Sequence, residues 1–264
     1  MNSMIARLPF PVIQPDWPDL PSNIRAFSTS RRGGFSAGVY GNQYGVEGFN
    51  LGDHVADDIG AVSANRALLN QYTPHDVMFF SQVHGNIVLD AGSIHSGLVG
   101  DAAFSNAVGT VCAVLTADCL PVLFADKAGR CVAAAHAGWR GLAGGILQRT
   151  VDRMRVAGAS ELTAWMGPAI GPAKFEVGQD VMDVFSSGLS DVEQYFRPKT
   201  DAGEERKYLA DIYGLARATL AKHGVVDVYG GSYCTVSDPA HFYSYRRDGV
   251  TGRMGHLIWI DQPR

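Results

Sequence analysis

Two side chains in the middle of the chain, Cys119 and His136, are of types that bind metals or act as nucleophile and base. They flank two apolar, β-branched-rich runs, residues 121–125 and 131–135, which predict two strands. Residues 127–129 lie between these runs and predict a tight turn. The segment is therefore expected to be a β-hairpin with Cys119 and His136 at its open end.

The register expected for this hairpin places the two side chains opposite each other. If the turn is tight, the opposed pairs are Asp126 with Gly129, Leu120 with Ala135, and Cys119 with His136. Directly opposed residues have Cβ atoms about 4.5–5.5 Å apart, a distance that suits a shared metal ion or a thiolate–imidazole pair. Small residues and then an expected helix follow His136, so the backbone can approach a ligand closely there.

A third candidate ligand is His84, in the segment FFSQVHGNIVLD. Residues 77–81 predict a strand, residues 87–90 predict a second one, and His84 lies beside a glycine between them. A histidine at a strand end is placed like a functional loop residue on a rigid scaffold. Three His and Cys ligands leave a fourth tetrahedral position for water or substrate, which is typical of catalytic zinc. Zinc with one thiolate and two neutral imidazoles keeps a net positive charge and can polarise a bound water.

Spacing alone leaves three interpretations of these residues open. His84, Cys119 and His136 form a metal trio, or Cys119 and His136 form a nucleophilic dyad, or the side chains are simply buried. Cys112 and Cys131 lie in apolar runs and are expected to be small buried side chains.

The rest of the chain predicts a mixture of strands and helices. Residues 30–58 are rich in glycine and predict a long irregular loop, and residues 190–208 predict a polar surface segment. Helices are expected within residues 57–72, 142–156, 180–186 and 209–223, and strands within residues 161–166, 225–231 and 255–260. Hairpins alternate with helices without regular βαβ units, which predicts the α/β (α+β) class with mixed sheets flanked by helices. We expect a single domain over residues 1–264, with residues 1–25 as an N-terminal extension.

Composition limits the location and the partners of the protein. The 264 residues have a formal net charge of −4 and no basic run, which argues against nucleic-acid binding. The four cysteines form no CxxC pair or disulfide framework, as expected in a reducing cytoplasm. The first 21 residues are interrupted by prolines, unlike a signal peptide, and no stretch has the length of a membrane span. We therefore expect a cytoplasmic monomer or homodimer that binds no membrane.

Five longer motifs carry a resemblance to a known family. They are SQVHG, LTADCLPVLFAD, AAAHAGWRGL, GPAIGP and YSYRRDGVTGRMGHLIWI. Over residues 31–260 the chain resembles the YfiH-like, laccase-domain-containing family, also called multicopper polyphenol oxidase-like. The family's zinc ligands are the histidine of QVHG, the cysteine of ADC and the histidine of HAGWRG, which fall on His84, Cys119 and His136.

The resemblance implies a zinc-dependent enzyme whose partners are a purine nucleoside and phosphate. The implied reactions are phosphorolysis of adenosine, inosine and S-methyl-5'-thioadenosine, and deamination of adenosine. The HxE…PCxxC signature of cytidine-type deaminases is absent, so deamination would use a different constellation. The family's copper label fits poorly, since a multicopper oxidase needs many histidines and this chain has eight and no His-x-His pair, although copper could occupy the same ligands. The alternatives are a Cys119/His136 hydrolase acting on an amide or a peptidoglycan precursor, and a scaffold without catalysis.

Five further residues are candidates for the catalytic or substrate site. Asp118 adjoins Cys119 and could orient a ligand or a water. Arg140 lies four residues past His136, at an expected helix start, and is a candidate for phosphate binding. The family's Arg-x-Gly-Gly motif falls on Arg31, and its Asn-Leu-Gly-x-His motif falls on Asn50 and His54, so these are also expected near the substrate. Where many relatives carry cysteines after Ile-Gly-Pro, this chain has Ala173 and Lys174, which leaves no thiol role there.

Overall fold

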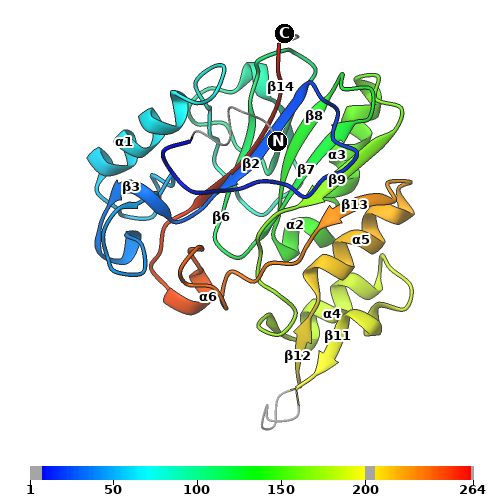
Figure 1. Cartoon of the computed structure of the whole chain (residues 1–264). Coiled ribbons are helices and arrows are strands. Elements are labelled where there is room, and N and C mark those ends of the chain that lie inside the picture. The colour runs from blue at the N-terminus through cyan, green and yellow to red at the C-terminus, as the bar shows by residue number, and fades with distance from the viewer. Residues whose placement is uncertain (1–7, 200–205, 263–264) are drawn as a thin grey trace.

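A computed structural model describes residues 8–199 and 206–262 of the protein. A six-stranded sheet forms its centre, in the order β13-β9-β7-β8-β5-β4 (Figure 1). The strands are β4 (Val88–Asp90), β5 (Ala102–Ser105), β7 (Leu120–Asp126), β8 (Val132–Ala137), β9 (Leu162–Met166) and β13 (Asp227–Gly230). The outer pairs β4–β5 and β9–β13 are parallel and the inner pairs are antiparallel, so the sheet is mixed.

A second, antiparallel sheet packs against the first in the order β1-β2-β14-β6. Its strands are β1 (Val12–Ile13), β2 (Ile24–Thr29), β6 (Cys112–Thr116) and β14 (Met254–Ile260). The side chains of β7 point alternately into two cores. Val122 and Phe124 face the helices, whereas Leu123 and Ala125 face the second sheet. Cys112 and Cys131 are buried, as expected.

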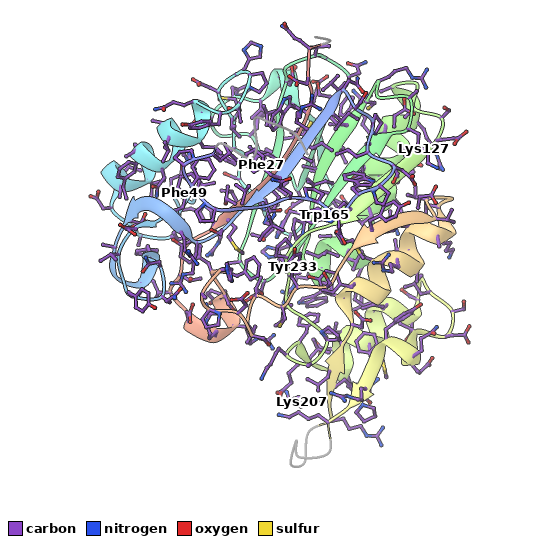
Figure 2. The ribbon with its side chains drawn as sticks, in the orientation of Figure 1. Phe27, Phe49, Lys127, Trp165, Lys207 and Tyr233 are labelled. Atoms are coloured by element: carbon purple, nitrogen blue, oxygen red, sulfur yellow. The ribbon has the colours of Figure 1, made fainter. Side chains whose placement is uncertain are left out.

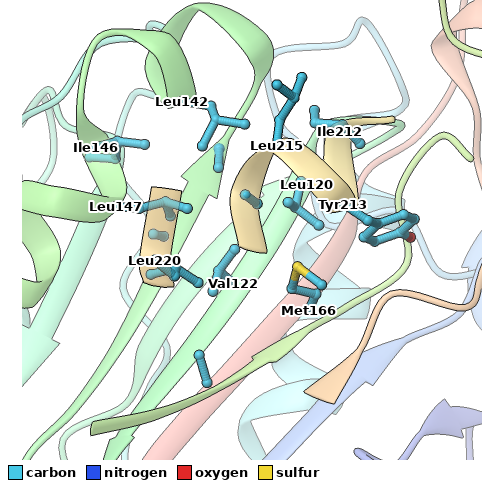
Figure 3. Packing of buried hydrophobic residues seen from close by; sticks show 14 of the residues in the cluster. Leu120, Val122, Leu142, Ile146, Leu147, Met166, Ile212, Tyr213, Leu215 and Leu220 are labelled. Atoms are coloured by element: carbon cyan, nitrogen blue, oxygen red, sulfur yellow. The ribbon is translucent and has the colours of Figure 1, made fainter. Parts of the chain in front are cut away.

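Helices cover the outer faces of both sheets. Leu120 and Val122 of β7 pack against α3 (Ile146–Val156) and α5 (Ile212–Lys222), as Figure 3 shows. α1 (Ile59–Asn70) covers the opposite side of the molecule, where its Leu69 packs with Phe27 and Phe49, both labelled in Figure 2. The order helix, sheet, sheet, helix confirms the expected α/β class with mixed sheets flanked by helices.

A smaller subassembly extends from this sandwich below α5 in Figure 1. It contains a three-stranded antiparallel sheet and two short helical elements: β10 (Glu176–Gly178), β11 (Phe196–Pro198), β12 (Lys207–Ala210), α4 (Gln179–Ser186) and the 3₁₀ helix Val192–Tyr195. The polar segment predicted at residues 190–208 is thus partly structured, and Val192 and Phe196 are buried in it; residues 200–205 lie outside the described part.

Local signals explain where helices begin and break. The Asp58 side chain accepts a hydrogen bond from the Ala61 amide (2.7 Å) and starts α1. The single helix expected over residues 142–156 is instead two, α2 (Trp139–Ala143) and α3. The break occurs because Gly145 has a φ of +92°, a left-handed conformation that interrupts helical geometry. The helix expected from residue 209 starts later, since residues up to Ala210 belong to β12 and Asp211 caps α5.

Two further expectations change, one about a strand and one about a loop. Residues 77–81 form no strand, and only Ser81 makes an isolated bridge, to Val99. The glycine-rich segment contains β3 (Arg32–Ser36) and the 3₁₀ helix Gly38–Tyr40. The remaining short helices are the 3₁₀ helix Ala91–Ser93 and α6 (Tyr245–Asp248).

The start of the described chain packs into the body of the protein. Phe10 is buried, and the Trp17 indole donates a hydrogen bond to the Thr163 hydroxyl of β9 (2.8 Å). Within the described residues, no helix combines the length and the apolar character that crossing a bilayer requires.

Candidate metal centre

The hairpin β7–β8 brings Cys119 and His136 together, although in a different register from the one predicted. Leu120 pairs with Ala137 and Pro121 with His136, so the prediction is wrong by two residues. The loop is longer than a two-residue turn: the Asp126 amide donates a hydrogen bond to the Cys131 carbonyl (2.9 Å), which leaves residues 127–130 between the two strands. A shift of two residues keeps every side chain on its face of the sheet. Cys119, just before β7, therefore still lies diagonally beside His136.

His84, Cys119 and His136 converge on one point. Their potential ligand atoms all lie within 4.8 Å of one another. The Sγ atom of Cys119 is 3.6 Å from Nε2 of His84, and the two imidazole rings are 4.8 Å apart between centroids. His136 is buried and His84 is exposed, so the cluster is open on one side. This donor set fits a transition metal with a free coordination position.

Glycine at two positions lets the backbone close around the cluster. A Cβ atom at Gly138 would lie 2.7 Å from Cδ2 of His84 and 3.0 Å from Sγ of Cys119. A Cβ atom at Gly141 would lie 2.8 Å from the Gly85 carbonyl. The small residues after His136 therefore allow the close approach that the sequence predicts.

The histidines are held by a buried carboxylate, Asp101, that the sequence analysis missed. Oδ1 of Asp101 lies 2.8 Å from Nδ1 of His136, and the His136 amide donates to the Asp101 carbonyl (2.7 Å). The same carboxylate accepts the backbone amides of His84 (2.9 Å) and Gly85 (2.7 Å). Because Nδ1–H of His136 points at a carboxylate, Nε2 is the nitrogen left for a metal. Asp101 has no motif around it, and only its place before a buried strand could have drawn attention to it.

The acidities of these groups reflect their mutual charges. Burial would raise the pKa of Asp101, but the hydrogen bonds from His136 and Gly85 hold it below its usual value. Burial would also raise the pKa of the Cys119 thiol, yet the neighbouring His136 and His84 lower it to about 6. Burial opposes protonation of His136, whereas the charges of Cys119 and Asp101 raise its pKa to about 9. In the absence of metal the arrangement thus favours a thiolate beside an imidazolium.

Asp118 is buried and ties three segments together beside Cys119. It has a φ of +94°, its Oδ1 accepts the Thr235 hydroxyl (2.5 Å), and its Oδ2 accepts the Arg246 amide (2.6 Å). Its carbonyl accepts the Ile170 amide (2.9 Å). Both carboxylate oxygens are therefore engaged by the protein, and the residue fixes the turn that presents Cys119.

The two arginines expected at the substrate lie in different surroundings. Arg31 is buried, donates to the carbonyls of Gly41 and Pro239, and stacks over Tyr243. Arg140 is exposed at the start of α2, with its guanidinium 4.3 Å from the Trp139 ring centroid. Arg31 thus joins loops, whereas Arg140 remains accessible on the segment that follows His136.

Asn50 and His54 also separate. Asn50 is buried. Its side-chain NH₂ group donates hydrogen bonds to the Gly52 carbonyl and to Asp57, and its Oδ1 accepts the backbone amides of Gly52 and Arg253. His54 is exposed, 3.6 Å from Asp53, at the edge of a cavity of about 450 Å³. Phe79, Ser81, Gln82 and Leu115 line the same cavity, and Gln82 is two residues from the ligand His84. Arg66 of α1 lines this cavity as well, whereas His84, Cys119 and His136 do not.

Comparison with known proteins supports this description. A family model described as multi-copper polyphenol oxidoreductase laccase matches residues 25–261. The chain is 46% identical over 248 residues to a protein of Pseudomonas aeruginosa named purine nucleoside phosphorylase, covering 94% of this chain and 98% of that one. It is 44% identical over 252 residues to purine nucleoside phosphorylase YfiH of Escherichia coli, covering 94% and 98% of the two chains.

Solved structures show the same fold. A crystal structure of a Neisseria meningitidis protein superimposes with a TM-score of 0.85 at 45% identity, covering 95% of this chain and 99% of that one. YlmD of Geobacillus stearothermophilus superimposes with a TM-score of 0.80 at 30% identity, covering 93% and 94% of the two chains. The chain therefore belongs to the multi-copper polyphenol oxidoreductase laccase family, within which it is similar to YfiH.

Proposed function

We propose that the protein is a zinc-dependent purine nucleoside phosphorylase that acts on adenosine, inosine and S-methyl-5'-thioadenosine and also deaminates adenosine. The observation that carries the proposal is the convergence of His84, Cys119 and His136 on one point. Relatives named purine nucleoside phosphorylase at 43–46% identity support the reaction class. A phosphorylase takes a small-molecule nucleoside and phosphate as its two substrates.

Phosphorolysis exchanges one bond at the sugar for another. An oxygen of hydrogen phosphate forms a bond to C1′ while the C1′–nitrogen bond to the purine breaks. The electron pair leaves with the base, which takes up the proton that the phosphate brought. The enzyme must therefore hold an anion beside a carbon that develops positive charge.

The residues of this chain supply a rigid frame for that exchange. Asp101 orients His136 and the loop of His84, while Asp118 holds the turn before Cys119. A bound zinc ion would supply Lewis acidity at the open side of the cluster. Two imidazoles and one thiolate are ligands that suit zinc. Within the described residues, this trio is the only group of three or more His, Cys, Asp or Glu side chains that could hold a metal ion. Copper binds such ligands more tightly than zinc and can therefore occupy the same site. Because a multicopper oxidase needs many more histidines, a copper-loaded sample is expected to show at most weak oxidase activity.

Product analysis tests the reaction directly. Zinc-loaded protein should release hypoxanthine and ribose 1-phosphate from inosine only when phosphate is present. Deamination of adenosine to inosine should proceed without phosphate. Absence of ribose 1-phosphate with all three nucleosides would refute the phosphorylase assignment.

The two activities are expected to share one site. His84→Ala removes a metal ligand, so both adenine release and inosine formation should fall below about 1% of wild type. His75→Ala, which changes an exposed histidine that does not line the cavity, is the matched control and should leave both rates intact. Metal analysis of Cys119→Ala and His136→Ala should show loss of zinc. Survival of one activity in metal-free protein would contradict the single-site assignment.

A Cys119/His136 hydrolase is a second candidate, because the histidines lower the pKa of the Cys119 thiol to about 6. Iodoacetamide separates the two. In metal-free protein, alkylation of Cys119 should rise with pH around 6, since the thiolate forms above the pKa. Zinc should suppress this reaction at Cys119 and leave Cys234 unaffected. A Cys119 that reacts equally fast in zinc-loaded, active protein would favour the dyad.

A further inference from the structure

Arg253 lies beside the segment that leads to the metal ligands. It immediately precedes β14, whose first pair joins Met254 to Thr116 of β6. Three residues after Thr116 the chain reaches Cys119. The antiparallel pairing therefore brings Arg253 to the end of the sheet at which Asp118 and Cys119 emerge.

The FNLGDH segment fixes the backbone and the stem of Arg253. Its amide donates to Oδ1 of Asn50 (2.8 Å), and its carbonyl accepts the Leu51 amide (3.1 Å). A Cβ atom at Gly52 would lie 2.7 Å from Cγ of Arg253, so the aliphatic stem runs along this glycine. Asn50 thus holds in place an arginine at the end of the sheet from which Asp118 and Cys119 emerge.

The guanidinium group of Arg253 is only partly used by the protein. Nη1 donates to the carbonyls of Thr251 (3.0 Å) and Gly252 (3.1 Å). Among the described residues, none accepts a hydrogen bond from Nε or Nη2, and neither atom is a buried one without a partner. These two nitrogens form the edge of the guanidinium that binds oxyanions in a bidentate manner.

The charges of Cys119 and Asp118 act on Arg253. Burial lowers the pKa of Arg253, whereas the negative charges of Cys119 and Asp118 raise it. The same arginine lowers the pKa of His54, although burial contributes more. Arg253 therefore acts electrostatically on both Cys119 and His54, the second of which lies at the rim of the cavity.

Three of the other arginines near the cluster, Arg31, Arg246 and Arg247, have guanidinium donors engaged by the protein. Arg31 is buried with its donors on backbone carbonyls. Arg247 is engaged by Asp248 and by carbonyls of residues 235, 236 and 242. Arg246 donates to the Glu176 carbonyl, and Arg140 stacks on Trp139. Arg253 combines a fixed stem, free donors and the charge of the cluster.

We propose that Arg253 binds the phosphate co-substrate through Nε and Nη2, between the metal cluster and the cavity at His54. This assignment rests on the proposed phosphorylase function and identifies the residue that recognises its anion.

Steady-state kinetics with inosine and varied inorganic phosphate test the assignment. Arg253→Gln should raise KM for phosphate about 10- to 100-fold, as expected for loss of a charge-assisted bidentate contact, with bound zinc retained. KM for inosine should change much less. Arg253→Lys keeps the charge without the bidentate edge and should fall between Arg253→Gln and wild type. Arg149→Gln, on the exposed face of α3, is the matched control.

Two results would overturn the inference. One is an unchanged KM for phosphate in folded, zinc-loaded Arg253→Gln and Arg253→Lys. The other is an equal or larger rise in Arg140→Gln, which would assign the phosphate to the arginine after His136.

A binding measurement separates this inference from the proposed function. Titration of zinc-loaded protein with inorganic phosphate, followed by ³¹P NMR, should show binding by wild type and loss of binding by Arg253→Gln. Binding that depends on Arg253 without nucleoside cleavage would refute the phosphorylase and keep the anion site. Cleavage with phosphate binding that ignores Arg253 would refute the anion site and keep the phosphorylase.

Discussion

Asp101 shows how a single buried side chain can organise a candidate metal cluster. Its carboxylate accepts Nδ1–H of His136 and the amides of His84 and Gly85, so it fixes two ligands from separate segments. A carboxylate behind a ligating histidine selects the tautomer and makes the other nitrogen a better donor. The spacing of His84 and His136 follows from this one shared partner.

Replacement of Asp101 by asparagine tests that role. The amide keeps the shape but loses the charge and offers only one acceptor oxygen, so zinc affinity should fall about 10- to 100-fold. Chelator competition measures the affinity, and circular dichroism checks the fold. Asp76→Asn, at an exposed position, is the control. Equal zinc affinity in Asp101→Asn and wild type would contradict the role.

The cluster was easier to predict than its support. Cys119 and His136 stand at the ends of two recognisable strands, and the types of all three side chains limit the chemistry, although the strand expected before His84 does not form. Asp101 contacts His136 across 35 positions of sequence, a distance over which no local pattern operates. Arg253 was missed for the same reason, because β14 pairs with β6 only in the folded chain.

At the scale of elements, apolar patterns predicted burial better than pairing. The strands β7, β8, β9 and β14 were expected, whereas residues 77–81 place Val77 and Phe80 in the core without joining a sheet. The hairpin register failed because the length of a loop containing a left-handed glycine, Gly129, is not visible in the strand pattern. The error was an even number of residues, so the predicted meeting of Cys119 and His136 survived it.

His256 links three strands of the second sheet and provides a prediction on stability. On β14, its Nδ1 contacts the Ser28 hydroxyl of β2 (2.7 Å) and its Nε2 contacts the Thr116 hydroxyl of β6 (2.8 Å). Burial, aided by the charge of His136, lowers its pKa from 6.5 to about 3, so the folded state holds the ring neutral. The unfolded state binds a proton below about pH 6.5, and the folded state does not.

Stability should therefore fall as the pH drops from about 6.5 towards 3, with a slope of up to about 1.4 kcal/mol per pH unit from this group. Above pH 6.5 the contribution is constant. Urea unfolding of wild type and His256→Gln between pH 4 and 7 measures it, and the variant should show a shallower pH dependence. Parallel curves would show that His256 does not titrate in this way.

At the scale of the whole molecule, the N-terminal segment bridges the layers. Residues 12–13 pair with β2, and Trp17 reaches β9 of the central sheet. The sequence predicted residues 1–25 to be an N-terminal extension, and the prolines in this segment argued only against a signal peptide. Prolines disfavour regular hydrogen bonding but do not prevent an aromatic side chain from being buried.

Trp17→Ala tests how much this segment contributes. Removal of a buried indole and its hydrogen bond should lower the free energy of unfolding by about 3–5 kcal/mol. Urea denaturation measures the difference, and Tyr44→Ala, at a side chain that is 80% exposed, should change it by less than about 0.5 kcal/mol. Equal midpoints for Trp17→Ala and wild type would show that residues 8–17 are dispensable for stability.

The position of β14 has a consequence for how the protein is made. This strand, residues 254–260, inserts between β2 and β6, which precede it by well over a hundred residues. Ribosomes deliver the N-terminal parts first. Until residues 254–260 have been made, β2 and β6 therefore present open edges that other nascent chains can pair with. The segment with Arg253 takes its place beside β6 only when β14 pairs, so a chain that has been made as far as Cys119 and His136 still lacks the arginine proposed to bind the anion.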